Sequence, residues 1–368
     1  MQYPRPMSFY QRPEFEGERA TPFPPELDIS RLTFFGADEH VVGRIVSQLT
    51  ATRFRRSGRL HGEYAFLSMG GLALDRHGTA IKIHTDSDDD TAQPSAFSQI
   101  EQHCQSKDFA FVQKLVVDGW DNLERYHSMP VLSENYAYRN YYHFKIKFLP
   151  HVRHFPDSAS TEIGIPSELM QKPFQRELAA AAFGHRRVVP MTMVLRVRDP
   201  QLMYEPVSRE GLLWLQGRLG KRARKGDRRI FVDRGPPPAE LKGTNAIRKG
   251  GNIAQDEAFR AFLEKHRFET INFGNGEIPV RDQIAMIDGA RVILSAHGAN
   301  LTNIVYAEPD VSVIEVLPSH WTYYSHMQIA LAVDLKYVGM VCETLNAEAD
   351  MVVNTAILTQ ALEAALAR

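Results

Sequence analysis

The second half of the sequence alternates regularly between apolar strands and helices, and this alternation constrains the fold more than any other feature. From residue 228 onward, apolar runs of strand length are separated by segments with helical periodicity. Such an alternation predicts a parallel sheet with right-handed crossover connections. The runs are apolar throughout, as expected of strands that helices cover on both faces. The expected strands span residues 228–234, 268–274, 291–296, 311–317 and 335–341.

Helices are expected in the segments between these strands. We expect Ser208 to cap the helix that precedes the first of them, because a serine hydroxyl can accept a hydrogen bond from an otherwise unpaired amide. Near the end of the chain, Leu358, Leu362 and Leu366 share one helical face, which predicts a helix that packs back onto the body. The other expected helices span residues 255–266, 279–290, 299–307 and 323–334.

The first half of the chain is α/β but less regular. Val41, Ile45 and Leu49 form one helical stripe. Glycine turns break residues 62–86 into strands. Further helices are expected at 96–105 and 174–184, and a strand at 109–120. The expected organisation is an extended N-terminal arm (1–30), an N-terminal α/β domain (31–190), a C-terminal Rossmann-like domain (191–345) and a terminal helix (346–368).

Charge and cysteine content exclude several functional classes. The net charge is −1, whereas a general nucleic-acid binder is usually strongly basic. Two cysteines cannot form a disulfide framework, which favours a reducing compartment. The N-terminal residues lack the apolar core of a signal peptide, and no run approaches the ~18 apolar residues of a membrane span. We therefore expect a cytoplasmic protein, with contact at the inner face of a membrane left open.

The turn after the strand at 291–296 has the composition of an anion site. Small residues here let backbone amides approach a ligand closely, and the helix that follows directs its N-terminal dipole toward this turn. A diphosphate fits such a site well. The alternative is a tight turn whose histidine has a purely structural partner. The expected phosphate-binding residues in this segment are His297, Gly298, Ala299, Asn300 and Thr302.

Four further residues are candidates for the same site. Arg234 ends a strand, and its guanidinium could grip a diphosphate with two hydrogen bonds. Arg248 lies in the next loop, where a solvated arginine is the alternative. Glu315 ends another strand and could accept hydrogen bonds from ribose or sugar hydroxyls, unless it caps the next turn. Tyr323 could stack on a base or sugar ring, although helix-start packing explains it equally well.

Residues 290–318 resemble the signature of glycosyltransferase family 61. The pattern is a small residue, an apolar strand, His-Gly-Ala-x-Leu-Thr-Asn, and a second apolar strand that ends in glutamate and proline. Upstream, the strand ending in Arg234 and the segment around Arg248 are similar to two further family elements. Residues 140–143, Asn-Tyr-Tyr-His, resemble the family's Asn-aromatic-aromatic-His element. The run after His143 is basic where the family usually has Trp and an acid or amide, which leaves the acceptor side open.

This resemblance implies a GT-B fold, in which two Rossmann-like domains face each other across a cleft. It implies an inverting, metal-independent transferase with a nucleotide-sugar donor, UDP-linked as a first choice, on the C-terminal domain. The acceptor would be a hydroxyl of a glycan or glycolipid in bacterial polysaccharide biosynthesis. His143 would be the catalytic base, with a structural histidine at a helix start as the alternative. No cofactor and no metal are expected.

The same sequence bears on other functions. A non-catalytic relic that binds nucleotides or glycans remains open because of the basic run after His143. An α/β-hydrolase needs a Gly-x-Ser-x-Gly elbow, and a Rossmann dehydrogenase needs Gly-x-Gly-x-x-Gly; the sequence has neither in place. The Asp-x-Asp of residues 86–90 could hold a metal but is better explained as a solvated loop. The basic run 217–229 could face an anionic membrane or polysaccharide-assembly partners, although a solvated helix end is the commoner explanation.

Overall fold

The structure, a computed structural model, separates into two compact units that are discontinuous in sequence. The first holds residues 1–23, 53–171 and 183–206, and the second holds 24–52, 172–182 and 207–368. The described residues are 15–16, 21–23, 27–50, 53–67, 72–82, 107–127, 129–131, 141–191, 194–204, 207–219, 223–235, 252–274, 277–319, 324–344 and 350–367.

The second unit is built on a six-stranded parallel sheet, as the alternation predicts. The strands run in the order β14-β13-β15-β16-β17-β3, and every neighbouring pair is parallel. A parallel sheet of this size is consistent with a Rossmann-like α/β fold. The strands are β3 (Leu32–Phe35), β13 (Lys225–Val232), β14 (Phe268–Ile271), β15 (Ala290–Ala296), β16 (Ser312–Pro318) and β17 (Lys336–Cys342).

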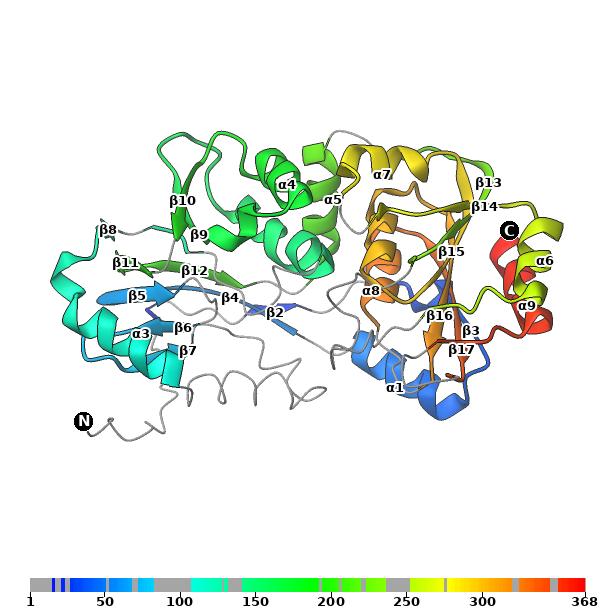
Figure 1. Cartoon of the computed structure of the whole chain (residues 1–368), viewed down its shortest axis with the longest axis horizontal. Helices are drawn as coiled ribbons and strands as arrows, with labels where there is room; N and C mark the ends of the chain where they lie inside the picture. The colour runs from blue at the N-terminus through cyan, green and yellow to red at the C-terminus, as the bar shows by residue number, and fades with distance from the viewer. Residues whose placement is uncertain are drawn as a thin grey trace. The chain divides into compact units, whose positions relative to one another are not determined.

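Helices cover both faces of this sheet, and alternate residues of each strand point to opposite faces. Val292, Ile314 and Val338 join the apolar core that α6 (Glu257–Lys265) and α9 (Thr355–Leu366) cover. Figure 1 shows these two helices on one face and α8 on the other. The opposite face therefore receives the odd-numbered side chains of β16 and β17. The remaining helices of the unit are α1 (Glu39–Thr50), α4 (Pro173–Phe183), α5 (Arg209–Leu219), α7 (Val280–Met286), η9 (Ala299–Tyr306) and α8 (Ser325–Ala332).

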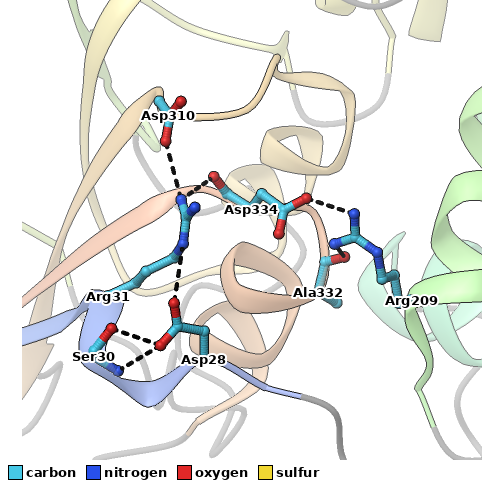
Figure 2. A network of polar contacts seen from close by, with 7 residues as sticks. All are labelled: Asp28, Ser30, Arg31, Arg209, Asp310, Ala332 and Asp334. Carbon is cyan, nitrogen blue, oxygen red and sulfur yellow. Dashed lines mark hydrogen bonds and ion pairs between the residues drawn. The ribbon is translucent and has the colours of Figure 1, made fainter.

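A polar network fixes the N-terminal strand β3 to the sheet. Arg31, directly before β3, donates to the Asp310 carboxylate at 3.1 Å and to the Asp334 carbonyl at 2.7 Å (Figure 2). Asp310 and Asp334 occupy left-handed turns, with φ of 64° and 63°, just before β16 and β17. Arg209, at the start of α5, donates to the Asp334 carboxylate at 2.6 Å. The network thus gathers the amino ends of three neighbouring strands.

The first unit differs from the second Rossmann-like domain that the resemblance implies. Its main sheet has the order β7-β6-β5-β11-β8, in which only β11 and β8 pair in parallel. A doubly wound sheet instead needs helical crossovers between parallel strands. Here a short connection joins the antiparallel strands β6 and β7, whereas β5 and β11 pair in the antiparallel sense although they are far apart in the chain. These strands are β5 (Glu63–Leu67), β6 (Leu72–Leu74), β7 (Ala80–Lys82), β8 (Arg125–His127) and β11 (Val194–Arg198).

Two smaller sheets and several helices complete the described part of the first unit. β9 and β10 form a parallel pair, while β1, β2 and β12 each pair with β4 in the antiparallel sense. The bounds are β1 (Phe15–Glu16), β2 (Thr21–Phe23), β4 (Arg53–Leu60), β9 (Glu162–Pro166), β10 (Arg187–Met191), β12 (Gln201–Tyr204), α3 (Lys107–Asp118), the π-helix η4 (His143–Phe148) and the 3₁₀ helices η2 (Trp120–Asn122), η5 (Leu149–His154) and η6 (Ser167–Met170). The 3₁₀ helix η1 (Ile29–Arg31) belongs to the second unit.

Two expectations about the first half need correction. The segment 109–120, expected as a strand, lies mostly in the helix α3, because Val112, Val116 and Trp120 pack together at helical spacing. The boundary expected near residue 31 also differs from the structure, since β3 pairs with β17 in the sheet of the second unit. Across the described part of the chain, every helix is too short or too polar to cross a membrane.

Candidate functional site

The candidate site lies at the carboxyl edge of the parallel sheet, where the strand order reverses. From β13 the chain moves outward to β14 and then crosses back to place β15 on the other side of β13. Loops that diverge from adjacent strands at such a point leave a crevice, and open α/β sheets bind ligands there. Arg234 follows β13 and His297 follows β15, so the two expected residues lie just after the two strands that flank the reversal.

Arg234 and Gly298 are packed directly against each other. The arginine Nη1 donates to the carbonyl of His297 at 2.7 Å, which ties the two loops together. A Cβ on Gly298 would lie only 2.6 Å from Nε and 2.7 Å from Cζ of Arg234. The guanidinium therefore occupies the space that any larger residue would need. The structure thus places these two predicted residues side by side.

The helix after this turn is a 3₁₀ helix rather than the expected α-helix. Gly298 is its N-cap, and its first hydrogen bond runs from the Leu301 amide to the Gly298 carbonyl at 2.9 Å. The amides of Ala299 and Asn300 come before that bond, as the donors at a helix start do. Together with the helix dipole they favour an anion at this end.

A buried amide pair holds the 3₁₀ helix in place. Asn303 donates to the Gln283 side chain at 2.7 Å, and Gln283 donates to the Ile278 carbonyl at 2.7 Å. Because Gln283 belongs to α7, the pair anchors η9 to that helix. Thr302, expected to offer its hydroxyl to the ligand, is fully buried, and no hydrogen-bond partner is found for this hydroxyl in the described part of the chain.

Glu315 has partners that the sequence analysis does not anticipate. Its Oε1 accepts from Nδ1 of His297 at 2.6 Å and from Nδ1 of His326 at 2.7 Å, and its Oε2 accepts from the Tyr337 hydroxyl at 2.5 Å. The residue is 0 % exposed. The sequence predicts a ligand for ribose or sugar hydroxyls, but the structure directs this carboxylate at protein groups, because β16 points it beneath α8.

The environment of this cluster sets its protonation. Burial alone would raise the pKa of Glu315, but the imidazoles of His326 and His297 lower it well below its usual 4.5. Burial lowers the pKa of His297 below its usual 6.5, and attraction to Glu315 only partly offsets this effect. Burial, then Glu315, raises the pKa of Tyr337. These directions agree on an ionised carboxylate that accepts from a neutral His297 and from a protonated phenol.

His297, Glu315 and His326 are also the one group of potential metal ligands found among the described residues, with candidate atoms within 4.8 Å of one another. Their nitrogen and oxygen atoms are separated by 2.6 and 2.7 Å, which are hydrogen-bond lengths. Ligands that share a tetrahedral zinc, each about 2.0–2.2 Å from the ion, stand further apart. The arrangement is therefore that of a hydrogen-bonded cluster.

His143 lies in the first unit, at the start of the π-helix η4, and is half-buried. Its ring meets Tyr142 edge-on, with 5.2 Å between centroids. Insertions of this helix type are rare and occur often at functional sites. Lys145, part of the basic run that departs from the family pattern, is 0 % exposed and lies 4.3 Å above the Tyr141 ring. At least one lysine of this basic run is therefore buried in the protein.

Arg248 and Tyr323, the two other predicted ligands, lie outside the described residues. So do Asn140 and the acidic loop 86–90. The structure thus places five predicted phosphate ligands, namely Arg234, His297, Gly298, Ala299 and Asn300, at one edge of the second unit, while Thr302 and Glu315 are buried behind them.

A comparison with protein families adds an independent finding. The model described as Glycosyltransferase 61 matches residues 141–314. Over these residues the chain is similar to this glycosyltransferase family. It begins two residues before His143 and ends one residue before Glu315, so it spans the reversal of strand order and both loops of the candidate site. A search of curated proteins returned no match.

Sequence reasoning missed His326 and Tyr337. Both lie beyond the signature, which ends at Pro318, and neither belongs to a spaced motif. The register pairs Glu315 with Gly339, which lies two residues after Tyr337 on β17. Because alternate residues of a strand point to the same face, this spacing could have placed Tyr337 on the same face as Glu315. Nothing local in the sequence marks His326 as a partner of the carboxylate.

Proposed function

We propose that this protein is an inverting glycosyltransferase that moves a sugar from a nucleotide-sugar donor to a hydroxyl of a glycan or glycolipid. The observation that carries the proposal is the pairing of Arg234 with Gly298 at the reversal of strand order, within the residues that match the transferase family. A UDP-linked donor is our first choice. The setting we propose is polysaccharide biosynthesis in a bacterial cytoplasm, with the enzyme free or peripheral to the membrane.

The donor diphosphate is the group that these residues suit. As the bond to the sugar breaks, negative charge gathers on the departing diphosphate. A guanidinium can meet that charge with two hydrogen bonds, and the amides of Ala299 and Asn300 add donors at a helix start. We assign this stabilisation to Arg234, His297 and the amides, so the proposed reaction needs no metal. Activity that persists in excess EDTA would agree with this assignment.

We assign the base to His143. In the proposed reaction an imidazole nitrogen takes the proton of the acceptor hydroxyl, and that oxygen attacks the anomeric carbon from the face opposite the diphosphate. That donor and acceptor are bound by different units, as in a GT-B enzyme, belongs to the same proposal, with a first unit whose main sheet is mixed instead of doubly wound. His143→Ala should leave donor binding intact and abolish transfer, whereas a structural histidine would affect stability and both functions together.

A thermal-shift panel of nucleoside mono- and diphosphates with UDP-, GDP- and ADP-sugars tests the donor site. A ligand that binds only the folded protein raises the melting temperature by mass action. We expect a diphosphate to give the largest shift and Arg234→Ala to abolish it. Arg229→Ala is the matched control, because this arginine lies on the same strand and donates to the His266 carbonyl, away from the site. A shift that Arg234→Ala leaves unchanged would refute the site.

Binding without transfer has its own meaning. If a donor binds through Arg234 but no acceptor extract supports sugar transfer, the result favours the alternative function, a non-catalytic protein that binds nucleotides or glycans. A radiolabelled donor panel with glycan and glycolipid acceptors makes this distinction, because a working enzyme releases free nucleotide in step with product.

A further inference from the structure

The cluster around Glu315 reaches the surface at one point only. The side chain of His297 is 11 % exposed, whereas those of Glu315 and His326 are 0 % and 2 % exposed. Tyr337 is also fully buried. His297 is thus the member through which this buried polar network can meet a ligand, and it lies in the turn whose carbonyl holds Arg234.

The hydrogen bonds fix which nitrogen of His297 faces the carboxylate. Glu315 is ionised and can only accept, so His297 Nδ1 must carry the hydrogen in the 2.6 Å contact. In the neutral ring Nε2 then has a lone pair, and in the protonated ring it is a donor. A phosphate oxygen requires a donor. Productive contact between His297 and a diphosphate therefore requires a second proton on this imidazole.

We propose that Glu315, held in place by His326 and Tyr337, positions His297 so that the imidazole takes up a proton at Nε2 when a diphosphate binds. Glu315 is then a positioning residue for the phosphate site instead of a sugar ligand. The proton comes from solvent, and no covalent bond changes. This inference rests on the proposed donor site and adds that donor binding is coupled to proton uptake.

The groups that face His297 explain why the proton arrives with the ligand. Burial, the neighbouring His326 and the cationic Arg234 all disfavour the charged ring, and Glu315 alone favours it. The ring centroids of the two histidines are 5.0 Å apart. A bound diphosphate adds negative charge beside His297 and Arg234, which shifts the balance toward the imidazolium. Tyr337, whose pKa burial raises, remains a neutral donor to Glu315.

Calorimetry measures this coupling directly. UDP is titrated into the full-length protein at pH 7.5 in buffers that differ in ionisation enthalpy, and the slope of the observed enthalpy gives the protons taken up. We expect net uptake by the wild-type protein. Glu315→Gln should lose most of this uptake and bind UDP about tenfold more weakly, as expected for one lost charged hydrogen bond. Glu269→Gln is the control, because it makes the same change on β14 in an exposed ion pair with Arg228.

The outcomes separate this inference from the proposed function. If UDP and the other nucleoside diphosphates fail to bind, the donor site itself is wrong. If UDP binds through Arg234 but Glu315→Gln takes up as many protons as the wild type, the coupling is wrong and the donor site stands. Equal losses in Glu315→Gln and Glu269→Gln would also overturn the coupling, because the effect would then reflect general charge.

A second measurement needs no variant at Glu315. The imidazole ¹⁵N resonances of the unliganded wild-type protein report the tautomer, with His297→Gln used for assignment. We expect a neutral His297 with its hydrogen on Nδ1, and an imidazolium after UDP is added. A hydrogen on Nε2 in the free protein would overturn the inference. So would a stoichiometric transition metal in the purified protein, because that ion would occupy the Nδ1 positions.

Discussion

Replacement of Gly298 by alanine tests the packing on which the proposed donor site depends. The added Cβ would lie 2.6 Å from Nε and 2.7 Å from Cζ of Arg234, whereas ordinary carbon contacts are about 3.5–4.0 Å. The guanidinium must move by roughly an ångström, which breaks its 2.7 Å bond to the His297 carbonyl. Since these atoms are the far end of a flexible side chain, we expect the free energy of unfolding to fall by less than about 1.5 kcal/mol.

Ligand binding should respond more strongly than stability. One charge-assisted hydrogen bond contributes about 1.5–3 kcal/mol, so the Kd for UDP should rise by roughly tenfold to 150-fold. Isothermal calorimetry gives the Kd, and urea unfolding gives the stability. In the double variant with Arg234→Ala the second change should add little, because both changes remove the same contact.

The control is Gly217→Ala on the exposed side of α5, where an added Cβ meets nothing within 4 Å. This change should leave the Kd unchanged and raise stability by about 0.5–1 kcal/mol. The reasoning is refuted if Gly298→Ala binds UDP within twofold of the wild type, since the guanidinium would then not need the position that the glycine leaves open.

Three further predictions test the fold and its protonation. Ser208→Ala should lower the free energy of unfolding by about 1 kcal/mol in urea titrations, because the hydroxyl accepts from the Gly211 amide at 3.0 Å and caps α5; an unchanged midpoint would contradict this. A chain that starts at Asp38 should lose β3, expose the edge of β17, and elute as aggregates in gel filtration; a monomer that binds UDP normally would show that β3 is dispensable. Folding lowers the pKa values of both His297 and Glu315, so the stability that these groups contribute is present above their usual pKa values of 6.5 and 4.5 and is lost as the pH falls below each value. Urea titrations from pH 8 to pH 4 should show this decline in the free energy of unfolding. Glu315→Gln should make the decline smaller at the acidic end of this range.

The parallel sheet could be predicted because its signal is local. β15, β16 and β17 are apolar runs that alternate with helices, β13 ends in an apolar run, and the structure contains each of the five expected strands from β13 to β17. The cap at Ser208 was predictable for the same reason, since a serine before a helix acts on the next few residues.

The remaining errors arise where distant residues decide the structure. β3 joins the sheet beside β17, and parallel pairing between segments so far apart leaves no periodic trace in either. The segment 109–120 is apolar enough to suggest a buried strand, yet Phe111 and Leu115 are 64 % and 50 % exposed on α3. Apolar residues three or four positions apart lie on one face of a helix. The segment has this spacing, but its overall apolar content led to the prediction of a strand.

The candidate site shows the same division. The turn with His297 and Gly298 and the strand-end arginine were predictable from motif and position. The role of Glu315 was not, because it depends on His326 in α8 and Tyr337 in β17, which lie beyond the signature. A carboxylate at the end of a strand can bind either a ligand or other protein groups, and only its neighbours in the folded chain distinguish the two.

The most direct test of the central claim is a crystal structure of the protein with UDP bound. We predict that phosphate oxygens lie within hydrogen-bond distance of the Arg234 guanidinium and of at least one amide at the start of η9, with His297 beside them. A diphosphate bound at any other edge of the sheet, with Arg234 and the Gly298 turn untouched, would contradict the account.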